Sequence, residues 1–87
     1  MNKDRRDRLS EVTSTIEEAK DQIQEIIDEE QDALDNLPDS LQDSERGLKM
    51  CDAINDMENL IGALDGFNTN LDGIVKKYSP QKKKKKE

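Results

Sequence analysis

Apolar residues in the first half of the chain recur in alternating steps of three and four residues. Between residues 9 and 37 they fill two positions of a seven-residue repeat, and Glu30 occupies the one gap. Such a heptad pattern is typical of a helix that packs along another helix. No glycine or proline interrupts this stretch, so we expect a helix over residues 3–36. The residues expected to face the partner helix are Leu9, Val12, Ile16, Ala19, Ile23, Ile26, Ala33 and Leu37.

A second heptad run follows and predicts a helix over residues 44–78. Pro38 disfavours helical backbone at the residue before it, and Ser40 and Ser44 are candidate N-caps, so the chain is expected to turn at residues 37–44. Two long helices joined by a short turn lie antiparallel. We therefore predict an all-α fold, an antiparallel helical hairpin over residues 1–78. The second run consists of Met50, Ile54, Met57, Ile61, Leu64, Asn68, Leu71, Val75 and Tyr78.

Each apolar stripe is wider than one partner helix can cover. The first helix adds Ile27 and Leu34 beside its heptad positions, and the second adds Ala53, Leu60, Phe67 and Ile74. We expect two hairpins to pair into a four-helix bundle, because closed dimers are the commonest oligomers. The alternative is that the uncovered face binds a different protein. The expected interface of a homodimer is Ile54, Met57, Leu60, Ile61, Leu64, Phe67, Asn68 and Leu71.

Two polar residues, Glu30 and Asn68, interrupt these apolar rows. A polar side chain at such a position can fix register and oligomeric state at a cost in stability. Glu30 lies close to the turn, where its side chain can reach water. For Asn68 two interpretations remain open: the residue fixes the register and oligomeric state of the helices, or it has no such role.

Charge is segregated along the chain. Residues 1–8 have a net charge of +2, residues 9–75 of −15 and residues 76–87 of +6, which gives −7 in total. Lysines occupy positions 82–86, and we expect residues 79–87 to form a disordered tail. The N-terminus lacks an apolar signal, and no apolar run is long enough to span a membrane, so we expect a cytoplasmic protein.

The residue types present argue against catalysis. The chain has no histidine and one cysteine, Cys51, so it offers no imidazole base, no internal disulfide and no cysteine-rich zinc site. A calcium loop beginning at Asp28 would place Ala33 where glycine is required. We therefore expect no catalytic residues, no cofactor and no bound metal.

Acidic residues are densest around the predicted turn. On a helical hairpin they form a charged surface that can bind a basic protein, although a solvated helix face is the more ordinary interpretation of such a run. With this acidic body, the lysine run does not predict sequence-specific nucleic-acid binding. The candidate partner-binding residues are Asp28, Glu29, Asp32, Asp35, Asp39 and Asp43.

The stretch of residues 28–47 contains the words Glu-Glu-Gln, Asn-Leu-Pro, Leu-Gln and Ser-Glu-Arg-Gly in this order. In this it resembles short acidic helical proteins of unknown function encoded by phages and prophages. The resemblance implies a viral or mobile-element origin, the cytoplasm of the host cell as location, and a helical hairpin. It brings no activity and no site residues.

Two functions remain as hypotheses. The first is a non-catalytic effector whose acidic helical surface occupies a basic site on a host protein. It could inhibit a defence enzyme or a nucleic-acid enzyme in this way, and mimicry of DNA is one form of such inhibition. The second is a self-assembling coiled-coil adaptor or scaffolding protein whose apolar stripe is the working surface. Salt should weaken the first kind of contact more than the second.

Overall fold

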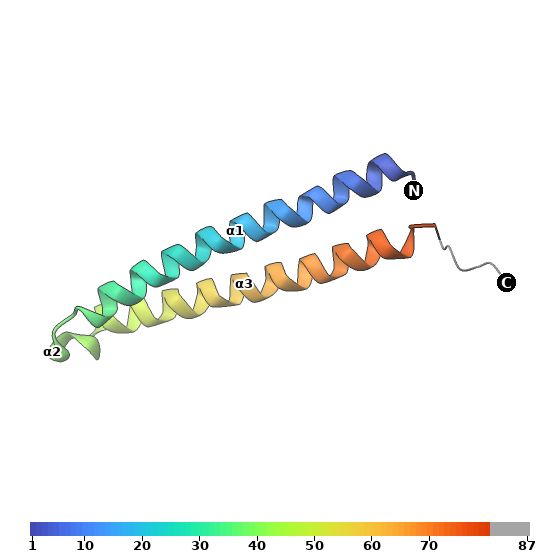
Figure 1. Cartoon of the computed structure of the whole chain (residues 1–87). Coiled ribbons are helices and arrows are strands. Elements are labelled where there is room, and N and C mark those ends of the chain that lie inside the picture. The colour runs from blue at the N-terminus through green and yellow to red at the C-terminus, as the bar shows by residue number, and fades with distance from the viewer. Residues whose placement is uncertain (81–87) are drawn as a thin grey trace.

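The chain folds into two long helices that lie side by side in opposite directions (Figure 1). The computed structural model describes residues 1–80. Helix α1 spans Lys3–Asp35, a short helix α2 spans Asp39–Gln42, and α3 spans Glu45–Lys77. No strand occurs in the described residues, so the predicted all-α class is confirmed for this part of the chain. The predicted tail falls outside the described residues from position 81 onward.

Both long helices begin at a capping side chain. Asn2 precedes α1, and its side-chain oxygen accepts a hydrogen bond of 2.9 Å from the backbone N–H of Arg5. Ser44 precedes α3 and accepts one of 3.4 Å from the N–H of Gly47. Such bonds satisfy backbone donors that have no partner inside the helix. Ser40, the other candidate cap, instead lies within α2.

The turn between α1 and α3 is compact and includes α2. Pro38 ends the first helical run, its carbonyl accepts the N–H of Leu41 at 2.8 Å, and the side chain of Gln42 donates to the carbonyl of Leu37 at 3.2 Å. Gly47 in the first turn of α3 is buried against this segment. A Cβ atom at Gly47 would lie 2.1 Å from the carbonyl oxygen of Gln42, so the backbones approach here as only glycine allows.

The face that α1 turns toward α3 is not fully the predicted one. Every second inward position is the residue after the predicted one, so that residues 13, 20, 27 and 34 replace residues 12, 19, 26 and 33. Val12 and Ile26 were expected to face inward, but they are 38% and 53% exposed, whereas Ile27 is 4% exposed. The prediction for this half of the heptad was therefore wrong. The inward-facing row of α1, which is buried or half-buried, is Leu9, Thr13, Ile16, Lys20, Ile23, Ile27, Glu30, Leu34 and Leu37.

This rotation of α1 has a physical reason at each end of the helix pair. Toward the turn it buries Ile27 and Leu34 instead of Ile26 and the smaller Ala33, which removes more apolar surface from water. Toward the termini it turns the backbone of Thr13 and the side chain of Lys20 to polar partners on α3. The apolar pattern of α1 alone contains both choices only toward the turn, at residues 26 and 27 and at residues 33 and 34.

The inward-facing row of α3 is the predicted one over most of its length. Ile54, Asn68 and Leu71 are buried, and Tyr78 at the end of the row is 48% exposed. Of the expected dimer interface, six residues thus lie against α1 within one chain, whereas Leu60 and Phe67 are exposed. Those six are Ile54, Met57, Ile61, Leu64, Asn68 and Leu71.

The molecule is elongated, with extents of 70 × 20 × 14 Å. The two termini of the described chain lie at the end opposite α2 (Figure 1). There the guanidinium of Arg6 donates to the carbonyl oxygen of Tyr78 at 3.3 Å and ties the start of α1 to the end of α3. The structure is a single pair of long helices, and the four-helix bundle stays a prediction.

Candidate binding surfaces

One side of α1 carries an almost continuous row of carboxylates. From residue 4 to residue 35 the row follows steps of three and four, interrupted once by Ser14, and all its acids are exposed. At about 1.5 Å per residue this is roughly one carboxylate per 5 Å of helix. The first two are paired on the same helix, Asp7 with Lys3 at 2.8 Å and Asp4 with Arg8 at 3.6 Å. We call this row the acidic face; it consists of Asp4, Asp7, Glu11, Glu18, Asp21, Glu25, Asp28, Asp32 and Asp35.

The structure divides the predicted partner-binding residues among different places. Asp28, Asp32 and Asp35 lie together on the acidic face, whereas Asp39 lies in α2 and Asp43 in the turn. Glu29 is exposed as well but lies on another side of α1. Gln24 donates to Asp28 and Gln31 to Asp35, each at 3.0 Å, so these carboxylates are positioned by neutral neighbours on their own helix.

The outer surface of α3 is different in character. Gly62, Gly66 and Gly73 lie there with open space where a Cβ would be. Acids are sparser on this helix, and among the described residues Asp72 pairs with Lys76 at 3.1 Å. Most of the negative charge of residues 9–75 therefore lies on α1 rather than on α3.

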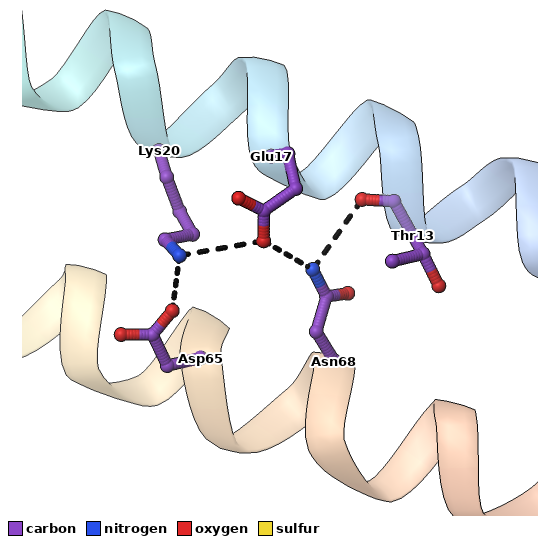
Figure 2. A network of polar contacts seen from close by, with 5 residues as sticks. All are labelled: Thr13, Glu17, Lys20, Asp65 and Asn68. Atoms are coloured by element: carbon purple, nitrogen blue, oxygen red, sulfur yellow. Dashed lines mark hydrogen bonds and ion pairs between the residues drawn. The ribbon is translucent and has the colours of Figure 1, made fainter.

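A polar network links α1 to α3 near the middle of the pair (Figure 2). The ammonium of Lys20 contacts the carboxylate of Asp65 and lies 3.3 Å from that of Glu17. The side-chain amide of Asn68 donates to Glu17 at 2.9 Å and to the backbone oxygen of Thr13 at 3.3 Å. These contacts fix the axial level at which the two helices meet.

Asn68 thus acts within a single chain, since it is only 8% exposed and bonded to α1. Its side-chain oxygen is buried and has no hydrogen-bond partner in the structure. An unsatisfied buried acceptor costs about 1–3 kcal/mol, so the residue specifies the pairing of α1 with α3 at the expense of stability. The composition of the heptad row pointed to Asn68 but not to its partners Thr13, Glu17, Lys20 and Asp65.

Lys20 is the only basic residue of α1 beyond position 8, and its side chain is 18% exposed. Its hydrogen bond to Asp65 is the main reason that its pKa is raised above the ordinary value of 10.5, and the contact with Glu17 acts in the same direction. The network therefore favours the charged ammonium. The single lysine among acids in the sequence was the signal for this site.

Replacing Lys20 by methionine should change the alkaline stability of the hairpin. A raised pKa in the folded state contributes stability that is complete below pH 10.5 and is lost as the pH rises through the folded-state value. We expect the difference in Tm between wild type and Lys20→Met to stay constant from pH 7 to about pH 10 and to shrink above it. Thermal melts followed by circular dichroism check this; a difference that keeps its size up to pH 12 would contradict it.

An apolar strip runs along the side of the helix pair that lies across from Glu17 and Asp65. On each helix one row lies one residue before an inward-facing position, and because the helices are antiparallel these two rows flank the same side of the pair. We call them together the apolar flank. Leu60 is 53% and Phe67 50% exposed. The apolar flank consists of Val12, Ala19, Ile26 and Ala33 from α1 and of Ala53, Leu60, Phe67 and Ile74 from α3.

The polar network independently supports this assignment of sides. Glu17 and Asp65 each lie four residues after an inward-facing position on their own helices, and both contact Lys20. Equivalent rows of the two helices therefore do share one side. The polar side holds Glu17 and Asp65, and the apolar flank lies across the pair from it.

Two shallow grooves lie along the helices. The one near the termini is lined by three apolar residues, including Val12 of the apolar flank, and by Arg5, Arg8, Glu11 and Thr15. The one near the turn is lined by Glu30, Glu45, Arg46, Lys49 and Met50. Neither contains a constellation of side chains suited to catalysis, and Cys51 is half-buried beside the helix interface.

Two further searches of residues 1–80 were negative. No group of three or more His, Cys, Asp or Glu side chains is arranged to hold a metal ion, and no helix has the length and apolar character needed to cross a bilayer. Comparison of the chain with family models, curated proteins and solved structures finds no match. Arguments about function therefore depend on the acidic face and the apolar flank.

Proposed function

We propose that this protein is a non-catalytic effector that binds a basic site on another protein through the acidic face of α1. The observation that carries the proposal is the exposure of nine carboxylates in one row over residues 4–35. A row of like charges held on a rigid helix attracts a basic partner and accelerates its encounter. Interactions of this kind need no pocket, and the grooves on the pair are shallow.

The partner is a host protein if the chain comes from a phage, as the sequence resemblance implies. A basic groove that normally holds nucleic acid, in a defence or nucleic-acid enzyme, fits a linear row of negative charges. One DNA strand has a charge about every 3.4 Å of axis, compared with roughly 5 Å for the acidic face. Occupation of such a groove would make the protein an inhibitor in the host cytoplasm, and its charge disfavours nucleic acid as the ligand.

The test is to reverse three charges of the acidic face together. The chain is used as bait in a host lysate, and affinity is then measured for the partner that it captures. We expect Asp28→Lys, Asp32→Lys and Asp35→Lys combined to weaken binding at least tenfold, about 1.4 kcal/mol, because these acids share one face. Binding of the wild type should fall steeply with added salt.

A matched control makes the same change in net charge on α3. Asp52→Lys, Glu58→Lys and Asp72→Lys combined should weaken binding less than about threefold if the face, rather than the total charge, is recognised. Removing residues 81–87 should leave affinity nearly unchanged. Equal losses in both triple variants, or loss of binding only on removal of the lysine run, would refute the proposal.

The second candidate function is a self-assembling coiled-coil adaptor that acts as a homodimer in the form of a four-helix bundle. The exposed apolar flank favours it, because large apolar side chains at half exposure on a soluble helix pair are usually covered by a partner. A partner bound through this flank should be weakened by salt much less than a partner bound through the acidic face, because apolar burial supplies most of the contact. That response separates the two candidates in one titration.

A further inference from the structure

The apolar flank forms one continuous zigzag along the helix pair. The contacts of Thr13 with Asn68 and of Lys20 with Asp65 set the axial levels of the two helices. At these levels the members of the two rows alternate between α3 and α1. From the terminal end toward the turn the order is Ile74, Val12, Phe67, Ala19, Leu60, Ile26.

Acidic residues are absent from these two rows, although acids occupy much of the remaining surface. Continued by one heptad, the row of α1 reaches Arg5 and that of α3 reaches Arg46. The flank is therefore the side of this acidic molecule on which two copies can approach with the least charge repulsion. A basic partner would be attracted to the acidic face instead.

The two ends of the helix pair also carry net charges of opposite sign. At the terminal end, residues 1–8 and 72–80 carry six basic and three acidic side chains, a net +3. At the turn end, residues 28–52 carry nine acidic side chains against Arg46 and Lys49, a net −7. Two copies side by side are thus attracted when their turns lie at opposite ends and repelled when their turns lie together.

We propose that a second copy of this chain covers the apolar flank, with its turn at the opposite end, in a two-fold symmetric four-helix bundle. The two-fold axis then crosses the long axis, so α1 packs on α1 of the other copy and α3 on α3. The acidic faces point away from this interface. This inference deepens the self-assembling candidate under the proposed function and rests on that candidate alone.

The groove near the termini agrees with this orientation, since two basic side chains and one acidic side chain, Glu11, line it. The groove near the termini presents Arg5 and Arg8 beside Val12, and in the opposed arrangement it meets the turn end of the other copy. Glu29 lies on the flank side of α1 near that turn, within the strongly acidic end. Apolar burial along the middle and opposite charges at the two ends thus act together.

The first experiment measures self-association by sedimentation equilibrium of the full chain. We expect a dimer at micromolar concentration and at least tenfold weaker dimerisation in Phe67→Glu, because a carboxylate would be buried in the interface. Thr69→Glu adds the same charge on the exposed outer side of α3, two residues away, and should change the dimer dissociation constant less than about threefold. Circular dichroism of both variants checks that the helix pair is still folded, since both positions are exposed.

The second experiment measures the orientation of the two copies. A spin label at Ser40→Cys in a Cys51→Ser background marks the turn, and the distance between the two labels is read by pulsed electron paramagnetic resonance. Opposed turns predict a separation of about 50 Å or more, the length of a 33-residue helix, whereas turns at the same end predict less than about 30 Å.

A monomeric wild type would overturn the proposal, and so would a dimer with a short label distance. A dimer that Phe67→Glu leaves intact would place the interface elsewhere and overturn it as well. None of these three results bears on the acidic face, whose test is the loss of partner binding in the triple reversal. The two proposals can therefore fail separately.

Discussion

Replacing Gly47 by alanine should destabilise the helix pair by roughly 1–3 kcal/mol or more. The new Cβ would lie 2.1 Å from the carbonyl oxygen of Gln42 and 2.8 Å from that of Leu41. Both obstacles are backbone atoms, which cannot rotate away as a flexible side chain can. The first turn of α3 must therefore move away from α2, and the Ser44 cap is disturbed with it. Urea denaturation followed by circular dichroism measures the change.

The other helical glycines provide a matched control for that result. A Cβ at Gly62, Gly66 or Gly73 would meet nothing within 4 Å. Alanine has the higher helix propensity, so each of these replacements should stabilise the protein by about 0.5–1 kcal/mol. If Gly47→Ala were as stable as Gly62→Ala, this would contradict the close approach of the α3 backbone to the turn at Gly47.

The second large effect is expected from shortening Ile27. This side chain is 4% exposed, and truncation to alanine should cost about 2–4 kcal/mol because it leaves a cavity between α1 and α3. Its neighbour Ile26 is 53% exposed and should cost less than about 1 kcal/mol when it is truncated in the same way. The pair of variants tests which residue of the heptad faces inward.

The comparison is made in the Phe67→Glu background, so that covering of the apolar flank by a second copy does not add to the effect at Ile26. Denaturant midpoints at two protein concentrations establish that this background is monomeric. A larger cost at Ile26 than at Ile27 would restore the row that the heptad pattern of α1 first predicted, and would contradict the rotation of this helix.

The rotation of α1 also explains how the two candidate binding surfaces coexist. With Ile27 facing α3, Ile26 joins Leu60 and Phe67 on the apolar flank, and the carboxylates at positions 28, 32 and 35 point to solvent on another side. A dimer formed through the flank would leave both acidic faces free. Self-association and binding of a basic partner are therefore compatible on one molecule.

The sequence alone determined the two long helices and the place of the turn. Heptad spacing without internal glycine or proline predicts α1, Pro38 ends the first helical run, and the Ser44 side chain caps α3. These are local effects that depend on residues within a few positions of one another. The expected inward row of α3 is also found in the structure, although the adjacent row with Leu60, Phe67 and Ile74 is apolar as well.

Only the tertiary structure decided which side of α1 faces α3. Toward the turn, α1 has apolar residues at adjacent positions, 26 and 27 and again 33 and 34, and toward the termini the inward positions hold the polar residues Thr13 and Lys20. The choice depends on residues about 50 positions away in the chain: the side-chain amide of Asn68 donates to the backbone oxygen of Thr13, and Asp65 pairs with Lys20. The same rotation decided where the exposed surfaces lie. Periodicity records that a helix has a wide apolar stripe, but the partner helix determines which edge of that stripe is buried and which remains for another molecule.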